Sequence, residues 1–182
     1  MEINKKRRYL LAALLIISVA PGFAAGVDTN SRVKPLDEKQ INKTLWHLVE
    51  ELIKRVPFTK SSLEELLRIP FMETRKTIHT IFYEGQPVGL SDGAVLEKID
   101  LRIGLDEGAP GFLVLDLSGT CFTLTDVQSN FNATKIAQIP SGHSVEEATV
   151  HTTMQSRSTL SFGFREKNPN CLAYIAFDPH KK

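Results

Sequence analysis

The two cysteines are the residues of this chain with the clearest potential for chemistry. Cys121 lies in the stretch "GTCFTLTDVQSNF", residues 119–131, directly before an expected helix, and Cys171 precedes an apolar run near the end of the chain. In an oxidising compartment, two cysteines usually form one disulfide. Closing a loop of about 50 residues would stabilise the fold by roughly 4 kcal/mol in the chain-entropy model. We therefore predict a disulfide between Cys121 and Cys171 and not a reactive thiol.

Serine and histidine are the other residues that could do chemistry. The segment "IPSGHS" places Ser141, His143 and Ser144 in an expected loop, but neighbours in sequence need not align as base and nucleophile. Ser118 in "LDLSGT" lacks the glycine that a nucleophile elbow requires two residues earlier. A small hydrolase that uses residues of the 118–151 region is the weakest of three functional hypotheses.

The sequence contains no recognisable metal or phosphate site. The two cysteines have no nearby ligands that would complete a zinc shell. The glycines mark turns and form no phosphate-binding loop. The five histidines do not follow a metal-ligand spacing; they are His47, His79, His143, His151 and His180. We predict no catalytic residue, no metal and no cofactor.

The N-terminus has the three-part layout of a secretory signal peptide. Four consecutive cations, residues 5–8, precede an unbroken apolar run over residues 9–20, and small residues follow Pro21. The run is too short for a membrane span, which needs about 20 residues. We predict a signal peptide over residues 1–24, with cleavage after Ala24 or, alternatively, after Gly26. An uncleaved anchor is the other interpretation.

The charge of the remaining chain argues against nucleic acid as a partner. The whole chain has a net charge of +1, and the signal segment carries four cations and one acid. The exported part is therefore near −2, whereas phosphate binding requires a basic face. With the apolar signal run removed, we expect no transmembrane segment and a periplasmic or secreted location.

Helical periodicity appears twice in the first third of the exported chain. Residues 25–36 are polar and read as a flexible lead-in. Apolar residues then recur at helical spacing up to Pro57 and predict an amphipathic helix over residues 37–55. In "TKSSLEELLRIP", Ser61 with Glu64, or Ser62 with Glu65, matches a capping box for a second, short helix.

Strand patterns follow in two groups. The segment "RKTIHTIFYE" is rich in β-branched and aromatic residues, "AVLEKIDLRIG" alternates with Lys98, Asp100 and Arg102 on one face, and "FLVLDL" is an apolar run. Within residues 119–131, Thr123 and Asp126 repeat the capping pattern. Three further strand patterns follow that stretch: "ATVHTTMQ", "TLSFGFRE" and "CLAYIAFD". The chain thus repeats the order helix, strand, strand, strand.

This order predicts an α+β fold: an N-terminal amphipathic helix, then two helix-plus-three-strand units that form antiparallel sheet. We place one domain over residues 37–178, with units 58–117 and 121–178 and a tail over 179–182. The units match at an offset of about 60 residues, as "LVLD" and "IAFD" show. Similar element order can also arise without duplication.

Tandem units of a short capped helix and antiparallel sheet resemble the architecture of beta-lactamase inhibitory proteins. The stretch "FTLTDVQSNF" is similar to the helix that opens each unit in that family. The resemblance covers residues 58–178 at the level of element order, and it carries over no binding residue. It implies a non-enzymatic protein that presents a sheet face to another protein.

We therefore expect an exported protein-binding domain, an inhibitor or immunity protein against an envelope-acting enzyme. The alternative is an envelope assembly module that binds a membrane-complex subunit or peptidoglycan. Two segments are expected partner-binding edges: residues 71–93, rich in aromatics and turn residues, and the loop over residues 131–144.

Overall fold

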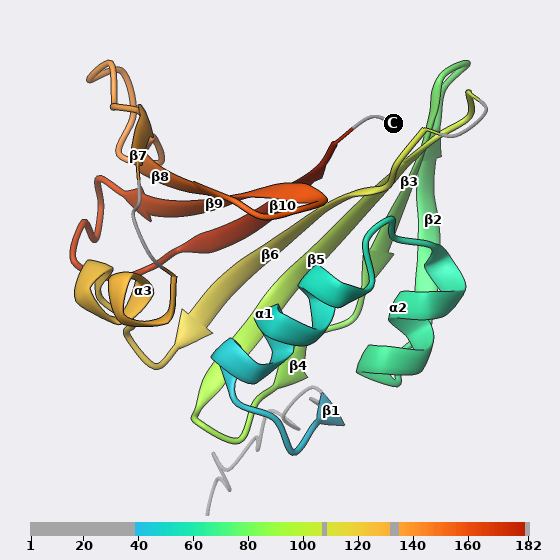
Figure 1. The fold of residues 1–182 in the computed structure, drawn as a ribbon, viewed down its shortest axis with the longest axis horizontal. Helices are drawn as coiled ribbons and strands as arrows, with labels where there is room; N and C mark the ends of the chain where they lie inside the picture. Colours follow the sequence, from blue (N-terminus) through green and yellow to red (C-terminus); the bar gives the residue numbers. More distant parts are fainter. Residues whose placement is uncertain (1–38, 107–108, 132–134, 181–182) are drawn as a thin grey trace, which may run out of the picture. The chain divides into compact units, whose positions relative to one another are not determined.

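The computed structural model describes residues 39–106, 109–131 and 135–180 (Figure 1). The predicted signal peptide and the whole of the expected lead-in lie outside these residues, so those assignments stay predictions. The elements follow in this order: β1 (Lys39–Gln40), α1 (Leu45–Lys54), α2 (Lys60–Leu67), β2 (Phe71–Lys76), β3 (Thr80–Gly85), β4 (Val88–Gly89), β5 (Ala94–Gly104), β6 (Phe112–Gly119), α3 (Leu124–Asn130), β7 (Lys135–Gln138), β8 (Ala148–Met154), β9 (Ser158–Arg165) and β10 (Tyr174–Pro179).

The predicted fold class is wrong. Strands make up 44% of the described residues and helices 18%, and the strands form one ten-stranded mixed sheet. The segment expected as the first unit contributes five strands, β2 to β6, and the second contributes four, β7 to β10. The two sets join because β10 pairs antiparallel with both β6 and β9. The sheet is mixed because β1 runs parallel to β4.

The first helix is shorter than the periodicity predicts. Residues 39 and 40, expected inside a helix over 37–55, instead pair with β4, and the Ile41 N–H donates to the Gly89 carbonyl at 2.9 Å. Helix α1 begins at Leu45, whose N–H donates to Asp92 Oδ2 at 2.7 Å, and Thr44 is the N-cap. A loop carboxylate and a capping threonine thus set this boundary, and the apolar pattern of residues 41–56 does not reveal them.

The two short helices differ in how well their caps were predicted. The capping box of α3, Thr123 with Asp126, is confirmed. For α2, both predicted pairs are wrong, because Thr59 is the N-cap and Ser62 completes the box. Thr59 and Ser62 keep the spacing of three residues but lack the acidic partner that identifies a capping box in sequence.

The segment "RKTIHTIFYE" is a hairpin and not a single strand. Strands β2 and β3 pair antiparallel, and residues 77–79 turn between them without glycine or proline. The Thr77 hydroxyl accepts hydrogen bonds from the N–H groups of His79 and Thr80. A threonine side chain therefore closes this turn, where sequence composition indicates continuous strand.

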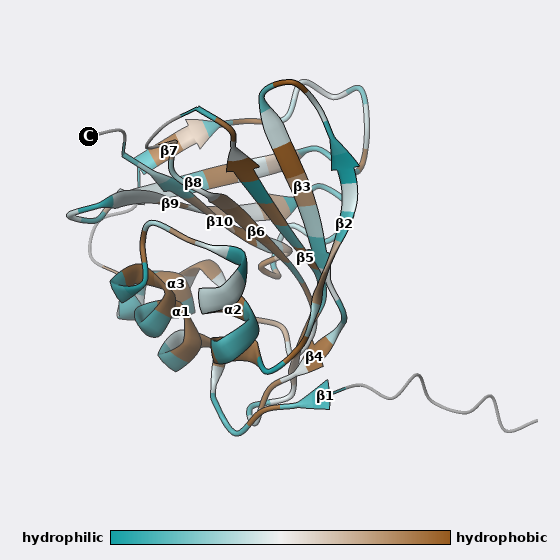
Figure 2. Cartoon of the chain, turned by 90° about the vertical axis from the view of Figure 1, so that its right-hand side faces the viewer, coloured by the Kyte–Doolittle hydropathy of each residue, from teal (hydrophilic) through white to brown (hydrophobic). Residues whose placement is uncertain are grey.

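All three helices pack on the same face of the sheet (Figure 2). On β6, Leu113 and Leu115 are fully buried on this side, and on β10 Ile175 and Phe177 are their partners. Edge-to-face aromatic contacts join Trp46 of α1 to residues around α3. This face holds the hydrophobic core and leaves the alternate side chains of each strand pointing away from the helices.

Candidate functional site

The face of the sheet that points away from the helices is the candidate functional site. Its side chains are aligned across six strands by the observed register, and each is partly or fully exposed. We call this set the open face; it comprises Arg75, Phe82, Asp100, Arg102, Phe112, Val114, Asp116, Ser161, Arg165 and Tyr174. The residues come from β2, β3, β5, β6, β9 and β10, so no single segment of the sequence reveals it.

Four residues of neighbouring strands alternate between arginine and phenylalanine across one end of this face. The pairing aligns Arg75 with Phe82, Phe82 with Arg102, and Arg102 with Phe112. The guanidinium carbon of Arg75 lies 3.8 Å from the Phe82 ring centre. That of Arg102 lies 5.8 Å from Phe82 and 5.5 Å from Phe112. We call these four residues the Arg–Phe ladder, and its spacings are those of cation–π contacts.

A hollow of about 260 Å³ opens beside the ladder. Within it, Arg102 donates from Nε and Nη2 to one Asp100 oxygen, at 3.1 and 2.7 Å. Lys98 Nζ lies 3.8 Å from a Glu84 carboxylate oxygen. These pairs use both carboxylates of the hollow, whereas no described carboxylate forms an ion pair with Arg75.

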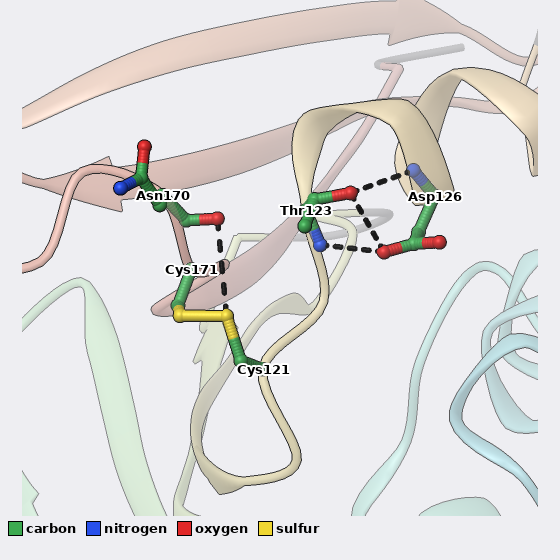
Figure 3. The surroundings of a disulfide bond; sticks show 5 residues. All are labelled: Cys121, Thr123, Asp126, Asn170 and Cys171. Carbon is green, nitrogen blue, oxygen red and sulfur yellow. Dashed lines mark hydrogen bonds between the residues drawn. A yellow bond between two sulfur atoms is a disulfide. The ribbon is translucent and has the colours of Figure 1, made fainter.

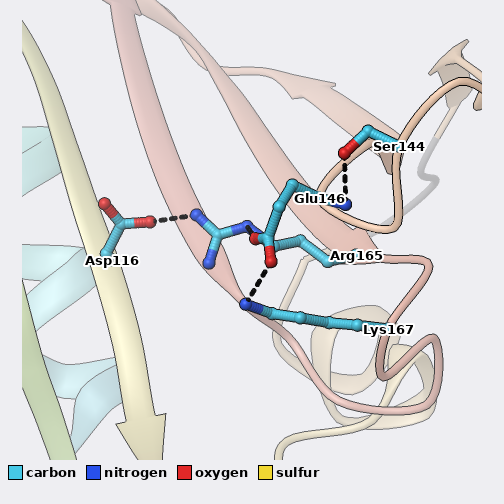
Figure 4. Close-up of polar contacts among 5 residues, drawn as sticks. All are labelled: Asp116, Ser144, Glu146, Arg165 and Lys167. Carbon is cyan, nitrogen blue, oxygen red and sulfur yellow. Dashed lines mark hydrogen bonds and ion pairs between the residues drawn. The ribbon is translucent and has the colours of Figure 1, made fainter.

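The end of the open face opposite the ladder, where β9 ends at Arg165, carries a network of four charged side chains (Figure 4). Arg165 donates from Nη2 to Asp116 at 2.6 Å, and its Nε lies 3.6 Å from Glu146. Lys167 donates to the other Glu146 oxygen at 2.8 Å. The hydrogen bond from Lys167, with the charge of Arg165, holds the pKa of Glu146 below its ordinary value. Arg165 is thereby fixed between two carboxylates that belong to different segments.

Tyr174 lies on the open face against a glycine of the neighbouring strand. Its register partner is Gly163, and a Cβ added to that glycine would overlap the ring. Arg165 Cζ lies 5.8 Å from the same ring. Partial burial raises the pKa of the Tyr174 hydroxyl. Gly163 thus makes room for an aromatic ring that lies flat on the sheet.

The two cysteines form a disulfide at the margin of this face, in agreement with the predicted pairing (Figure 3). Their Cα atoms are 4.9 Å apart. Cys121 lies in the segment that joins β6 to α3, and Cys171 lies in the segment that joins β9 to β10. The sequence predicted Cys171 at the start of the final strand, whereas that strand begins three residues later, at Tyr174. The bond ties the helix cap at Thr123 to the strand that closes the sheet.

In the structure, the side chains of Ser141 and His143, neighbours in the segment "IPSGHS", are in contact. The oxygen of Ser141 lies 2.9 Å from His143 Nδ1 and equally 2.9 Å from Glu147. The hydrogen bond from the Ser141 hydroxyl lowers the pKa of Glu147, and the N–H groups of Ser141 and Gly142 lower it further by donating to the same carboxylate. The Ser141 hydroxyl donates to Glu147, and its contact with His143 Nδ1 helps to close a turn on an exposed loop.

The described part of the chain holds no group of three His, Cys, Asp or Glu residues that could bind a metal ion. Its helices are also too short or too polar to cross a membrane. The predicted absence of catalytic and cofactor-binding residues stays a prediction, since nothing observed here tests it.

Sequence reasoning identified part of the open face. The alternation over residues 94–104 placed Asp100 and Arg102 on one side of a strand, and the segment 71–93, expected as a partner-binding edge, contains Arg75 and Phe82. Phe112 and Tyr174 were missed because both lie in apolar runs that show no alternation. Only the register of β6 with β5 and β10 places them on the same face.

Three comparisons with known proteins found no match to this chain. No protein-family model, no curated protein and no solved structure matches it. The geometry of the chain itself is therefore the basis for any functional proposal.

Proposed function

We propose that this protein is an exported protein-binding domain that uses the open face of its sheet, and that it inhibits an envelope-acting enzyme. The observation that carries this proposal is the Arg–Phe ladder, a row of arginine and aromatic side chains partly exposed on a rigid sheet. Arginine and aromatic residues are enriched in protein interfaces, and arginine is also enriched among their energetic hot spots.

The exposure of the ladder side chains, and the contacts that hold them in place, favour a binding role over a purely structural one. Phe82 and Phe112 are only partly buried, and Arg102 keeps 45% of its side chain exposed although it is held by Asp100. Side chains fixed before binding lose little conformational entropy when a partner arrives. The ladder side chains are therefore already ordered for contact with another molecule.

The inhibitory role and the compartment rest on the sequence. The predicted signal peptide and the disulfide are compatible with an oxidising compartment outside the cytoplasm. The resemblance to beta-lactamase inhibitory proteins, stated on element order, implies a sheet face that is presented to another protein. An envelope assembly module with the same face is the alternative proposal.

Capture from an envelope extract tests the proposal. The immobilised disulfide-bonded protein would be compared with Phe82→Ala and Phe112→Ala variants, and with Lys60→Ala on α2 as a control outside the open face. We expect a protein captured by wild type and by the control, and lost with the open-face variants. Assay of that protein for hydrolase activity, with and without added inhibitor, then separates inhibition from assembly.

Two outcomes would contradict the proposal. Capture that is unchanged by the open-face variants would place the contact elsewhere. Hydrolytic turnover by the pure protein, abolished by Ser141→Ala, would instead favour the small hydrolase hypothesis.

A further inference from the structure

We infer that the Arg75 end of the open face binds a carboxylate side chain of the partner protein. This inference rests on the proposed protein-binding function and names the chemistry of the contact. It places a glutamate or aspartate of the partner in the hollow beside the Arg–Phe ladder.

Arg75 is held in place but is not neutralised. Its guanidinium lies 3.8 Å from the Phe82 ring centre, the shortest of the cation–π contacts on this face. Stacking on the ring leaves the in-plane N–H donors of a guanidinium directed outward, in the fork that matches two carboxylate oxygens. Among the described residues no acidic side chain occupies that fork, in contrast to Arg102, which pairs with one carboxylate, and Arg165, which pairs with two.

The charges that line the hollow leave room for one negative group. Arg75, Lys98 and Arg102 are the cations, and Glu84 and Asp100 are the acids, so the lining has an excess of one positive charge. Each acid already faces a cation, Glu84 facing Lys98 and Asp100 facing Arg102. The unmatched charge therefore belongs to Arg75.

Charge and shape favour a carboxylate over a phosphate. A phosphate group carries nearly two charges near neutral pH and would meet repulsion from Glu84 and Asp100, whereas a single carboxylate matches the excess of one. The partly exposed ring of Phe82 offers apolar surface for the methylene groups of a glutamate. A glutamate or aspartate side chain satisfies both the donors and the ring.

Nuclear magnetic resonance titration with a blocked poly-glutamate peptide tests the inference. The full exported chain would be labelled so that the arginine side-chain Nε–H signals are observed, and a blocked poly-glutamine peptide and inorganic phosphate would be titrated in parallel. We expect the Arg75 signal to shift with poly-glutamate and to stay in place with poly-glutamine. The Arg75→Gln variant should bind poly-glutamate about tenfold more weakly.

Lys76→Gln is the matched control, because it removes the same charge from the next residue of β2. Arg75 pairs with Phe82 on the open face, whereas Lys76 pairs with Ile81, so the two side chains point to opposite faces. Affinity lost equally in both variants would overturn the inference and indicate non-specific attraction. Thermal denaturation of each variant checks that folding is unchanged.

Two other results would also overturn it. The first is an Arg75 signal that does not move with poly-glutamate, and the second is phosphate binding that is tighter than poly-glutamate binding. Either result leaves capture of a protein through Phe82 and Phe112 unaffected. Conversely, the capture experiment could fail while poly-glutamate still binds specifically at Arg75. That result would contradict the proposed function and would support the carboxylate site.

Discussion

The two faces of the sheet use the same strands for different purposes. On β6, Leu113 and Leu115 face the helices with no exposed surface, while Phe112, Val114 and Asp116 between and beside them are partly exposed on the open face. The covered face is apolar and packed, and the open face combines rings with charges, most of which are held by ion pairs. Because successive residues alternate between the faces, stability and recognition can be separated by single substitutions one position apart.

Substitution of two neighbouring residues on β5 is expected to show the largest difference between the two faces. Leu101→Ala, on the fully buried side, should lower the free energy of unfolding by about 2 to 5 kcal/mol, because it leaves a cavity in the core. Arg102→Ala, on the open face, should cost less than about 1 kcal/mol, since its ion pair is partly exposed. Chemical denaturation of both variants measures the difference, and equal losses would refute the separation of roles.

Removing the disulfide should have the next largest effect. The double variant Cys121→Ser, Cys171→Ser opens a loop with a sequence separation of 50 residues. We expect a loss of about 2 to 4 kcal/mol in denaturant unfolding. Wild-type protein under reducing conditions should show the same loss. Two free thiols in unreduced, denatured wild type would show instead that the bond is absent in solution.

Gly163→Ala tests whether the open face also contains a packed site. The added methyl group would overlap the Tyr174 ring, so the ring or the strand must move, at a cost of about 1 to 3 kcal/mol. Thermal or chemical denaturation measures the loss. The double variant with Tyr174→Ala should recover part of the stability lost through overlap. An unchanged single variant would mean that the ring moves aside freely.

The smallest predicted effect is the contribution of Glu146 to the stability of the fold at acidic pH. Its pKa is below the ordinary value of 4.5 in the folded protein, chiefly because Lys167 donates a hydrogen bond to it. Ionised Glu146 therefore stabilises the fold at pH values above 4.5, and this contribution is lost as the pH falls through the lowered pKa. Denaturant unfolding at a series of acidic pH values should show a shallower decline for Glu146→Gln than for wild type. Glu166→Gln serves as the matched control, and a decline as shallow as that of Glu146→Gln would contradict the assignment.

The sequence predicted local features better than the architecture. The α3 cap could be predicted because Thr123 and Asp126 form one motif within four residues. The cysteine pair could be predicted because the chain contains only two cysteines. The fold class failed because it depends on β10 joining β6 to β9, a pairing of distant segments that periodicity does not encode. The hairpin at residues 71–85 was missed because Thr77 closes the turn without the usual glycine or proline.

The same distance in sequence explains why only part of the open face was predicted. Alternation within β5 indicated Asp100 and Arg102, since both faces of that strand differ in polarity. Arg75 reaches the ladder after an irregularity in the pairing of β2 with β3, which shifts the register between Glu73 and Arg75. Such a bulge has no signature in this sequence, so its effect on which side chains face outward emerges only from the fold.

The position of β10 also determines the order in which the protein can fold. Ile175 of β10 pairs with Leu115 on one edge and with Phe162 on the other, so β6 and β9 both keep open hydrogen-bonding edges until the last strand arrives. The sheet cannot close during synthesis before residues 174–179 are available. A chain shortened before Tyr174 would leave these edges of β6 and β9 open to aggregation.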